Sequence, residues 1–407
     1  MQDSTVHTPI QLDLSSFHED FGALISEMKT WRQHLHQHPE TAFEEFQTSE
    51  FIAEKLESFG LKVHQGLGVT GLVATLQVGS SNKSIALRAD MDALPVQEQN
   101  DIPHRSQHQG KMHACGHDGH SAMLLGAAKY LSLHPDFDGT VHFIFQPAEE
   151  SFGGASRMID EGLFDLFPVQ SVYGLHNFPD IPAGQFAAKS GAMMASFDTF
   201  EINLMGKGCH AAMPHQGHDP LVAASQMVLA LQSIVSRNID PQQAAVVSVT
   251  QVHGGNTWNT IPEQVQVRGT FRCLNVETQQ QIQQRIEEIT SSLCVAMHVK
   301  AEVTFNPETV AYPPTVNTEH ETNQALDVAA SLVGKTNINR EPQPSMGAED
   351  FSFMLQKKPG CYIWLGGKTE NTQGMLHHPK YDFNDYILSF GTAYWIRLVQ
   401  SQLPINT

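Results

Sequence analysis

Apolar strand patterns and amphipathic helical patterns alternate along the first 190 residues. Ser84 to Ala89 and Val141 to Phe145 are short apolar runs typical of buried strands, and Asp118 to Leu133 between them carries apolar residues at helical spacing. A strand, a helix and a second strand in this order favour a parallel pair, because a parallel connection needs a long crossover. The sequence therefore predicts an α/β fold with a mostly parallel sheet covered by helices on both faces.

The pattern changes between residues 191 and 310. Asp219-Pro220 is typical of a helix N-cap followed by proline at the first helical position. Gln279 to Ala296 is a second helical segment with an isoleucine stripe, and alternating strands surround both helices. The resulting order, β-α-β-β-α-β, is that of ferredoxin-like domains. We therefore predict one domain made of residues 1–190 and 311–407, with a ferredoxin-like domain inserted at 191–310.

The acidic composition limits what the chain binds. The 24 Lys and Arg residues and 43 Asp and Glu residues give a formal net charge of −19, which argues against nucleic acid and against an anionic membrane surface. The sequence has no uninterrupted apolar run of about 18 residues, so we expect no membrane-spanning helix. Met1 to Ser16 shows no basic region followed by an apolar stretch, and cysteines are sparse. These features predict a cytoplasmic protein.

Metal-ligating residue types collect where the predicted strands end, which is where ligands bind in open α/β sheets. Thiolate, imidazole and carboxylate groups are the ligands of zinc and similar divalent ions. One carboxylate of a Glu-Glu pair can bind metal while the other acts as general base on a metal-bound water. Such signals recur at successive strand ends, which predicts a metal site. The residues concerned are Asp90, Asp92, Cys115, His117, Glu149, Glu150, His176, His377 and His378.

Two further patterns carry less chemistry. His34, His36 and His38 lie near a helix break, and we interpret them mainly as surface or packing residues. Gly206 to Ala211 fits the loose G-x-G-x-x-A dinucleotide pattern, but Pro214 and Gly217 separate it from the helix that should follow directly. A tight turn that presents His210 is therefore the favoured interpretation.

Several longer stretches resemble the M20 metallopeptidase superfamily. The similarity is closest to its amidohydrolase branch, which contains hippurate hydrolases, N-acyl-amino-acid amidohydrolases and indole-acetyl-amino-acid hydrolases. It extends over nearly the whole chain, and the Cys-Gly-His-Asp motif is specific to this branch. The stretches are 88–95, 113–118, 145–150, 206–214, 259–262, 346–351 and 377–383.

The resemblance implies a centre of two divalent metal ions per subunit. Zinc or manganese is expected, and nickel or cobalt accept the same ligands. Of the adjacent pair His377 and His378, the resemblance favours the first as a ligand. The implied ligands are Cys115 as the bridge, Glu150 and His377 at one ion, and His117 and His176 at the other.

The resemblance also assigns roles around the metals. Glu149 would be the general base that takes a proton from the metal-bridging water and passes it to the leaving amine. Asp92 and Asp118 would orient ligands from behind.

In the resembling proteins the inserted domain is a lid and a dimerisation surface, which implies a homodimer or higher homo-oligomer. His210 would reach a neighbouring subunit and stabilise the tetrahedral oxyanion. Asn259 and Arg272 are candidates for binding the substrate carboxylate. Cys209 departs from the pattern, because glycine or serine is common there.

The implied activity is hydrolysis of the amide bond of an N-acyl amino acid to a carboxylic acid and a free amino acid. A dipeptidase or carboxypeptidase on the same scaffold is the alternative within enzymes. A non-catalytic metal-binding protein is a further alternative, which Glu149 disfavours because a pure binding site has no use for a second carboxylate. The sequence leaves open the acyl group, the amino acid, its stereochemistry and the native metal.

Overall fold

The computed structural model describes residues 10–370 and 374–405 and divides the chain into two compact units. Unit 1 contains the N-terminal part up to Gly191, together with Val316–Gln343 and the chain from Phe353 onward. Unit 2 contains Ala192–Thr315 and Pro344–Ser352. The first nine residues of the segment 1–16, on which the absence of a leader was predicted, lie outside the described residues.

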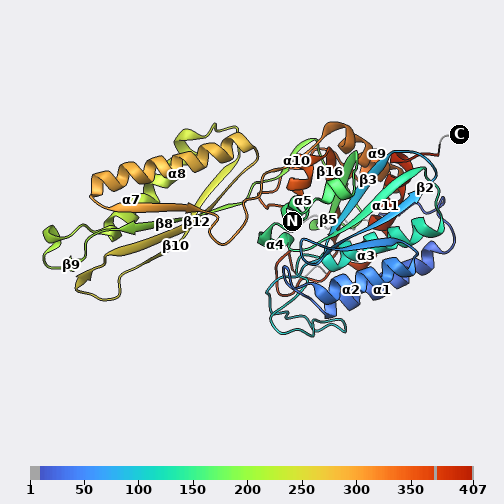
Figure 1. Cartoon of the computed structure of the whole chain (residues 1–407), viewed down its shortest axis with the longest axis horizontal. Coiled ribbons are helices and arrows are strands. Elements are labelled where there is room, and N and C mark those ends of the chain that lie inside the picture. Colours follow the sequence, from blue (N-terminus) through green and yellow to red (C-terminus); the bar gives the residue numbers. More distant parts are fainter. Residues whose placement is uncertain (1–9, 371–373, 406–407) are drawn as a thin grey trace, which may run out of the picture. The chain divides into compact units, whose positions relative to one another are not determined.

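Unit 1 is built on an eight-stranded sheet with the strand order β1-β2-β4-β3-β5-β16-β6-β15 (Figure 1). The central strands β4, β3, β5 and β16 run parallel. The pairs β1–β2, β2–β4 and β16–β6 are antiparallel. The strands are β1 (Lys62–Leu67), β2 (Gly71–Val78), β3 (Ser84–Asp90), β4 (Gly139–Gln146), β5 (Ser171–Pro182), β6 (Phe186–Ala187), β15 (Ile338–Asn339) and β16 (Gly360–Lys368).

The sheet as a whole is therefore mixed, whereas the sequence predicts a mostly parallel one. The difference lies at the edges. β1 and β2 are joined by three residues, which is too short for a parallel crossover and leaves an antiparallel hairpin. β1 is mostly exposed and carries polar residues, so no apolar run signals it in the sequence.

The helices of unit 1 pack on this sheet and on each other. α3 contacts α1, α11 and β3, and most of its side chains are buried. Gly126 of α3 makes this packing possible, because a Cβ there would lie 2.1 Å from the sulfur of Met28 on α1. The helices are α1 (Phe21–Gln37), α2 (Phe46–Ser58), α3 (His117–Leu133), α4 (Glu149–Phe152), α5 (Gly154–Asp160), α6 (Leu163–Leu166), α9 (Glu319–Val333), η3 (Lys335–Asn337), η4 (Asp385–Ile387) and α11 (Leu388–Gln402).

Unit 2 has a four-stranded antiparallel sheet in the order β10-β12-β8-β13, on which α7 and α8 pack (Figure 1). Along the chain the elements run β8-α7-β10-β12-α8-β13. β9 and β11 form a separate two-stranded sheet. The bounds are β8 (Asp198–Met205), β9 (Cys209–His210), η1 (Pro214–Gln216), α7 (Pro220–Ser233), η2 (Ile234–Asn238), β10 (Ala245–Gly254), β11 (Thr260–Ile261), β12 (Gln264–Cys273), α8 (Val276–Met297) and β13 (Lys300–Phe305).

The remaining elements are short. β7 and β14 pair in a two-stranded sheet. Within the described residues, none of the helices combines the length and the apolar character needed to cross a membrane. The bounds are β7 (Gly191–Met194), β14 (Thr315–Asn317) and α10 (Phe351–Lys357).

The start of α7 agrees with the N-cap signal in the sequence. Asp219 Oδ1 accepts hydrogen bonds from the main-chain N–H of Leu221 and of Val222, at 2.9 and 3.3 Å. We expect Asp219→Ala to lower the free energy of unfolding by about 1 kcal/mol, because these N–H groups lose their acceptor. Denaturant titration of the variant measures this loss. Gln226→Ala removes an exposed side chain from the same helix and should stay within about 0.5 kcal/mol of the parent; equal losses would contradict the capping role.

Candidate metal centre

The predicted ligands are brought together by the parallel block of unit 1. Cys115 and His117 stand at the start of α3, and Glu149 and Glu150 follow β4 directly. His176 lies within β5, whose neighbour β3 is also the parallel neighbour of β4. Parallel strands end at the same edge of a sheet, so residues far apart in the sequence meet there.

The ligand atoms of these residues form a connected cluster. One ligand atom each from Cys115, Glu150 and His377 lies within 4.8 Å of the others, and the same holds for His117, Glu149 and Glu150. His176 joins through its Nε2, which lies 3.4 Å from Cys115 Sγ. His377 Nε2 lies 3.1 Å from a carboxylate oxygen of Glu150. The structure therefore brings all five predicted ligands and Glu149 together.

Several residues around the cluster have a positive φ angle, a backbone conformation that residues other than glycine rarely adopt. Gly116, between Cys115 and His117, has a φ of 96°, and a Cβ there would lie 2.3 Å from Asn177 Oδ1. Ala148, directly before Glu149, has a φ of 52°, and His377 has a φ of 66°. Left-handed non-glycine residues are strained and concentrate at functional sites.

The histidines are oriented as in metal sites. His117 Nδ1 lies 2.9 Å from the main-chain oxygen and 3.2 Å from Oδ1 of Asp92. His176 Nδ1 donates to the main-chain oxygen of Asn177 at 2.6 Å. In both rings Nδ1 is engaged, and Nε2 is left to face the cluster. His117 Nε2 is buried without a hydrogen-bond partner, so the side chains present fit a bound cation.

The electrostatics of the cluster also favour a cation. Burial raises the pKa of the Cys115 thiol, and the nearby carboxylates of Glu150 and Glu149 raise it further. Burial alone would lower the pKa of His117, but Asp90 and Asp92 raise it to about 10. Without a metal, the charge of the carboxylates is therefore balanced by a protonated His117 and limited by a neutral Cys115 thiol. A divalent ion replaces those protons and stabilises the thiolate.

Glu45 is a functional candidate that the sequence does not signal. It is fully buried, and its carboxylate accepts hydrogen bonds from the main-chain N–H of Ala148 at 2.9 Å and from Thr70 Oγ1 at 2.7 Å. Burial and the neighbouring Asp92 raise its pKa to about 7. Glu45 therefore holds the strained residue that precedes Glu149. No motif could reveal this contact, since the partners are about a hundred positions apart.

His120 is also absent from the predicted set, although one of its ring nitrogens lies within 4.8 Å of ligand atoms of Asp90, His117 and His176. Its Nδ1 lies 2.6 Å from Asp90 Oδ1. Its Nε2 lies 2.7 Å from Asn177 Oδ1 and 3.0 Å from the main-chain nitrogen of Asn177. Asp90 in turn pairs with Arg88 at 2.6 Å. One signal was available, because His120 follows His117 by three residues and the predicted helix begins at Asp118, directly after His117.

Asp118 and His36 form a second buried network. His36 Nδ1 lies 2.9 Å from Asp118 Oδ2, and its Nε2 lies 3.3 Å from Glu98 Oε1. Arg32 Nη1 is 3.7 Å from the same Asp118 oxygen. The prediction of surface or packing histidines covers both His34, which is exposed, and His36, but it does not include the ionic partners of His36. His36 is fully buried between two carboxylates, which its position beside an exposed neighbour, His34, does not reveal.

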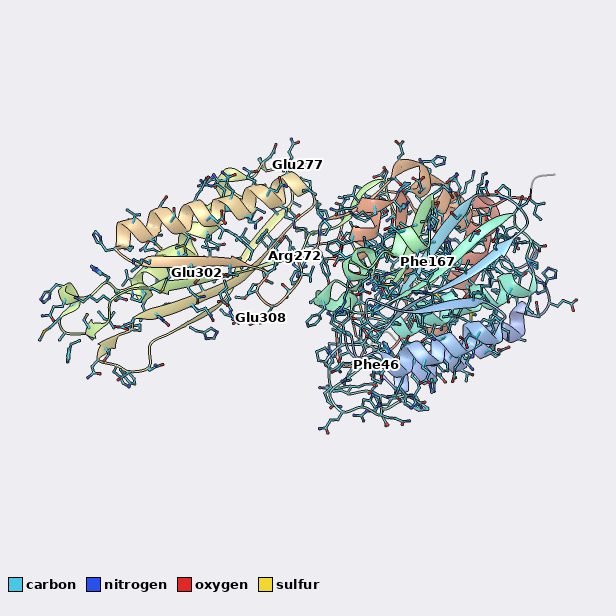
Figure 2. All side chains as sticks on the ribbon, in the orientation of Figure 1. Phe46, Phe167, Arg272, Glu277, Glu302 and Glu308 are labelled. Carbon is cyan, nitrogen blue, oxygen red and sulfur yellow. The ribbon has the colours of Figure 1, made fainter. Side chains whose placement is uncertain are left out.

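The remaining predicted residues belong to unit 2. His210 is exposed, and its Nδ1 accepts from the main-chain N–H of Ala212 at 3.1 Å, so the neutral ring carries its proton on Nε2. Asn259 is exposed, and its main-chain oxygen accepts from Ala211. Arg272, labelled in Figure 2, is half-buried, with its guanidinium 4.9 Å from the ring centre of Phe197.

The loop at Gly206–Ala211 is no dinucleotide fingerprint. Its residues lead into β9 and then into η1, and α7 begins only at Pro220. The sequence predicts a tight turn that presents His210, whereas the structure places His210 in strand β9 opposite Thr260 of β11. The turn follows His210, where the Met213 N–H donates to its main-chain oxygen.

Comparison with known proteins decides the family. The profile of peptidase family M20/M25/M40 matches residues 86–401. The chain belongs to this family. The hippurate hydrolase of Campylobacter jejuni is 41% identical over 381 residues, which cover 93% of this chain and 97% of that protein. The N-acetyl-L-cysteine deacetylase of Bacillus subtilis is also 41% identical, over 87% of this chain and 83% of that protein.

A solved structure extends the comparison to the metal centre. It is a Bacillus subtilis protein described as a dinuclear metal-binding peptidase from the M20 family. It is 33% identical to this chain, with a TM-score of 0.79 over 93% of this chain and 98% of that one. This likeness and the cluster of ligand atoms support divalent metal binding by the present M20 chain.

Metal removal should reveal the centre without any substrate. We expect Zn²⁺ or Mn²⁺ added to chelator-treated protein to raise the free energy of unfolding by about 3 kcal/mol at an ion concentration a hundredfold above Kd. Thermal unfolding monitored with and without the ion measures the effect. Cys115→Ser should lose most of it, whereas Cys209→Ser, in unit 2, should keep it. An equal shift in both variants would contradict Cys115 as a ligand.

Proposed function

We propose that the protein is a metal-dependent amidohydrolase that acts on linear amides and cleaves N-acyl amino acids. The observation that carries this proposal is the buried carboxylate of Glu149, which lies within 4.8 Å of ligand atoms of His117 and Glu150. Relatives at 41% identity named as a hippurate hydrolase and an N-acetyl-L-cysteine deacetylase support the substrate class. A relative in Arabidopsis thaliana, also 41% identical, is named as an IAA-amino acid hydrolase.

The proposed centre holds two divalent ions, zinc or manganese. Cys115 would contact both ions. Its ligand atom forms one group with those of Glu150 and His377, and His176 Nε2 lies 3.4 Å from Cys115 Sγ. Glu150 and His377 would complete the site of one ion, and His117 and His176 that of the other. When bound, the ions lower the pKa of a water molecule and polarise the scissile carbonyl. Asp92 orients His117, and Asp118 supports the start of α3 through His36.

Glu149 supplies the proton transfer in this proposal. Its carboxylate takes a proton from the attacking water, whose oxygen bonds to the carbonyl carbon of the substrate. The same carboxyl then gives the proton to the amide nitrogen as the C–N bond breaks. The products are a carboxylic acid and a free amino acid, so atoms and charge balance. Burial keeps the group in a fixed position for this exchange.

His210 is proposed to stabilise the oxyanion at the centre of a neighbouring subunit. The neutral ring presents an N–H at Nε2, since Nδ1 accepts from Ala212. An exposed N–H of this kind is a suitable donor to the developing negative charge. Asn259 and Arg272 are the proposed partners of the substrate carboxylate, with the guanidinium held by Phe197.

Unit 2 is proposed to be a ferredoxin-like lid and the dimerisation surface. Two observations support a second copy as its partner. β10 is an edge strand of the four-stranded sheet. α7 exposes large apolar side chains at Leu221, Val222 and Leu229 on a helix that already buries its other face. An open strand edge and an adjacent apolar surface are features that oligomers cover. We also propose a cytoplasmic location.

Carboxypeptidase activity is the second candidate. Relatives in Saccharolobus solfataricus named as thermostable carboxypeptidases are 38% identical over 90% of this chain. A panel of N-acetyl, N-benzoyl and indole-acetyl amino acids beside N-blocked dipeptides, each with several metals, distinguishes the two. Release of the amino acid from the single-residue amides alone supports the first candidate.

Glu149→Gln should keep the bound metal and lower kcat for N-acyl amino acids by at least about a hundredfold, because the amide can no longer exchange the proton. Elemental analysis and a turnover assay measure both quantities. Glu54→Gln changes an exposed glutamate on α2 and should leave them unaffected. Near-normal turnover in Glu149→Gln would overturn the proposed mechanism.

His210→Ala should reduce kcat by about 10²- to 10³-fold without loss of metal, as expected for the removal of one oxyanion donor. If His210 acts on a neighbouring subunit, a mixture of His210→Ala and Glu149→Gln proteins should regain activity in hybrid dimers that contain one intact centre. Size-exclusion chromatography with tagged chains verifies subunit exchange. An exchanged but inactive mixture would exclude action across subunits.

A further inference from the structure

Trp258 is exposed in a way that no other tryptophan of the chain is. Its side chain is fully exposed, whereas those of Trp31, Trp364 and Trp395 are buried. An indole left in water gives up the largest apolar burial that any side chain offers. Exposed aromatic side chains with this much surface mark places where another molecule is bound.

The fold brings the backbone of Trp258 close to that of His210. β9 pairs with β11 so that Thr260 lies opposite His210, and Ala211 N–H donates to Asn259 O at 2.9 Å. Trp258 directly precedes Asn259. Even fully extended chain advances only about 3.3 Å per residue, so the Cα atoms of Trp258 and Thr260 are at most about 7 Å apart.

A further exposed apolar side chain flanks the same histidine. Met213 follows His210 in a tight turn, with its N–H donating to the His210 main-chain oxygen at 2.8 Å, and its side chain is exposed. Two exposed apolar side chains thus lie close to His210 along the chain, Met213 after β9 and Trp258 before β11. A histidine that only donates a hydrogen bond to the carbonyl oxygen would not need exposed apolar side chains near it.

The chemistry of an N-acyl amino acid explains why exposed apolar side chains lie near His210. The oxygen that His210 is proposed to contact is bonded to the carbonyl carbon, and the acyl group begins at that same carbon. A large side chain displayed within two residues of the strand partner of His210 is therefore within reach of the acyl group. Aromatic rings gain from contact at centre separations of about 4.5–7 Å, beyond the burial of their area.

We propose that Trp258 is a specificity-determining residue whose indole covers the acyl group of the substrate and favours aromatic over small acyl groups. This inference rests on the proposed function and on the proposed role of His210. The substrate acyl group is the proposed binding partner of the exposed indole, and a contact between subunits is the competing outcome of the test.

Paired substrates isolate the effect on the acyl group. N-benzoylglycine and N-acetylglycine share the amino acid and the scissile bond, so the ratio of their kcat/KM values reports the acyl contact alone. In the metal-loaded enzyme, Trp258→Ala should lower this ratio about tenfold, and Trp258→Phe should restore most of it. Val276→Ala removes an exposed apolar side chain next to Glu277, labelled in Figure 2 at the start of α8, and should leave the ratio unchanged.

Fluorescence gives a readout that does not depend on turnover. Because the other three tryptophans are buried, Trp258 dominates the long-wavelength emission. In metal-loaded Glu149→Gln, N-benzoylglycine should shift this emission to shorter wavelength as the indole is covered. The shift should be absent from the Glu149→Gln, Trp258→Phe double variant.

The outcomes test the role of Trp258 separately from the proposed function. An unchanged substrate ratio in Trp258→Ala overturns the inference even when the parent enzyme hydrolyses both substrates. An equal fall for both substrates together with loss of the dimer on size-exclusion chromatography also overturns it and assigns Trp258 to a subunit contact. If the parent enzyme hydrolyses neither substrate, the proposed function fails, and absence of the fluorescence shift then overturns the role of Trp258 as well.

Discussion

The balance of charge at the end of the parallel strands is the constraint on which the rest of unit 1 depends. Glu149, Glu150 and Asp90 bring carboxylates into a buried region together with the Cys115 thiol. Buried carboxylates are stable only when cations or protons compensate them. The raised pKa values of Cys115 and His117 reflect this requirement, and divalent metal binding would meet it with the same side chains.

Placing so many charges requires a second layer of fixed contacts. Asp92 and the main-chain oxygen of Asn177 orient His117 and His176, and His120 links Asp90 to Asn177. Glu45 holds the strained residue before Glu149. These contacts come from segments distant in the sequence, so the site is as much a product of the packing of α1, α2 and α3 as of the ligand motifs.

The parts of the fold that the sequence predicts are those with a local physical signal. The N-cap at Asp219 and the buried strands around Leu87 and Phe143 follow from side-chain chemistry and hydrophobic runs. The antiparallel edge strand β1 was missed, because an exposed strand needs no apolar pattern. The carboxylate partners of His36 were not predicted, since only tertiary packing brings Glu98 and Asp118 to it.

The sequence by itself determined the metal-ligating residue types at successive strand ends and the resemblance to family M20, because metal chemistry restricts a ligand to a few residue types. Only the tertiary structure decided which groups surround them. Glu45, His120 and His36 act through contacts between residues far apart along the chain, which leave no spacing pattern. The same holds for Trp258, whose closeness to His210 depends on the pairing of β9 with β11.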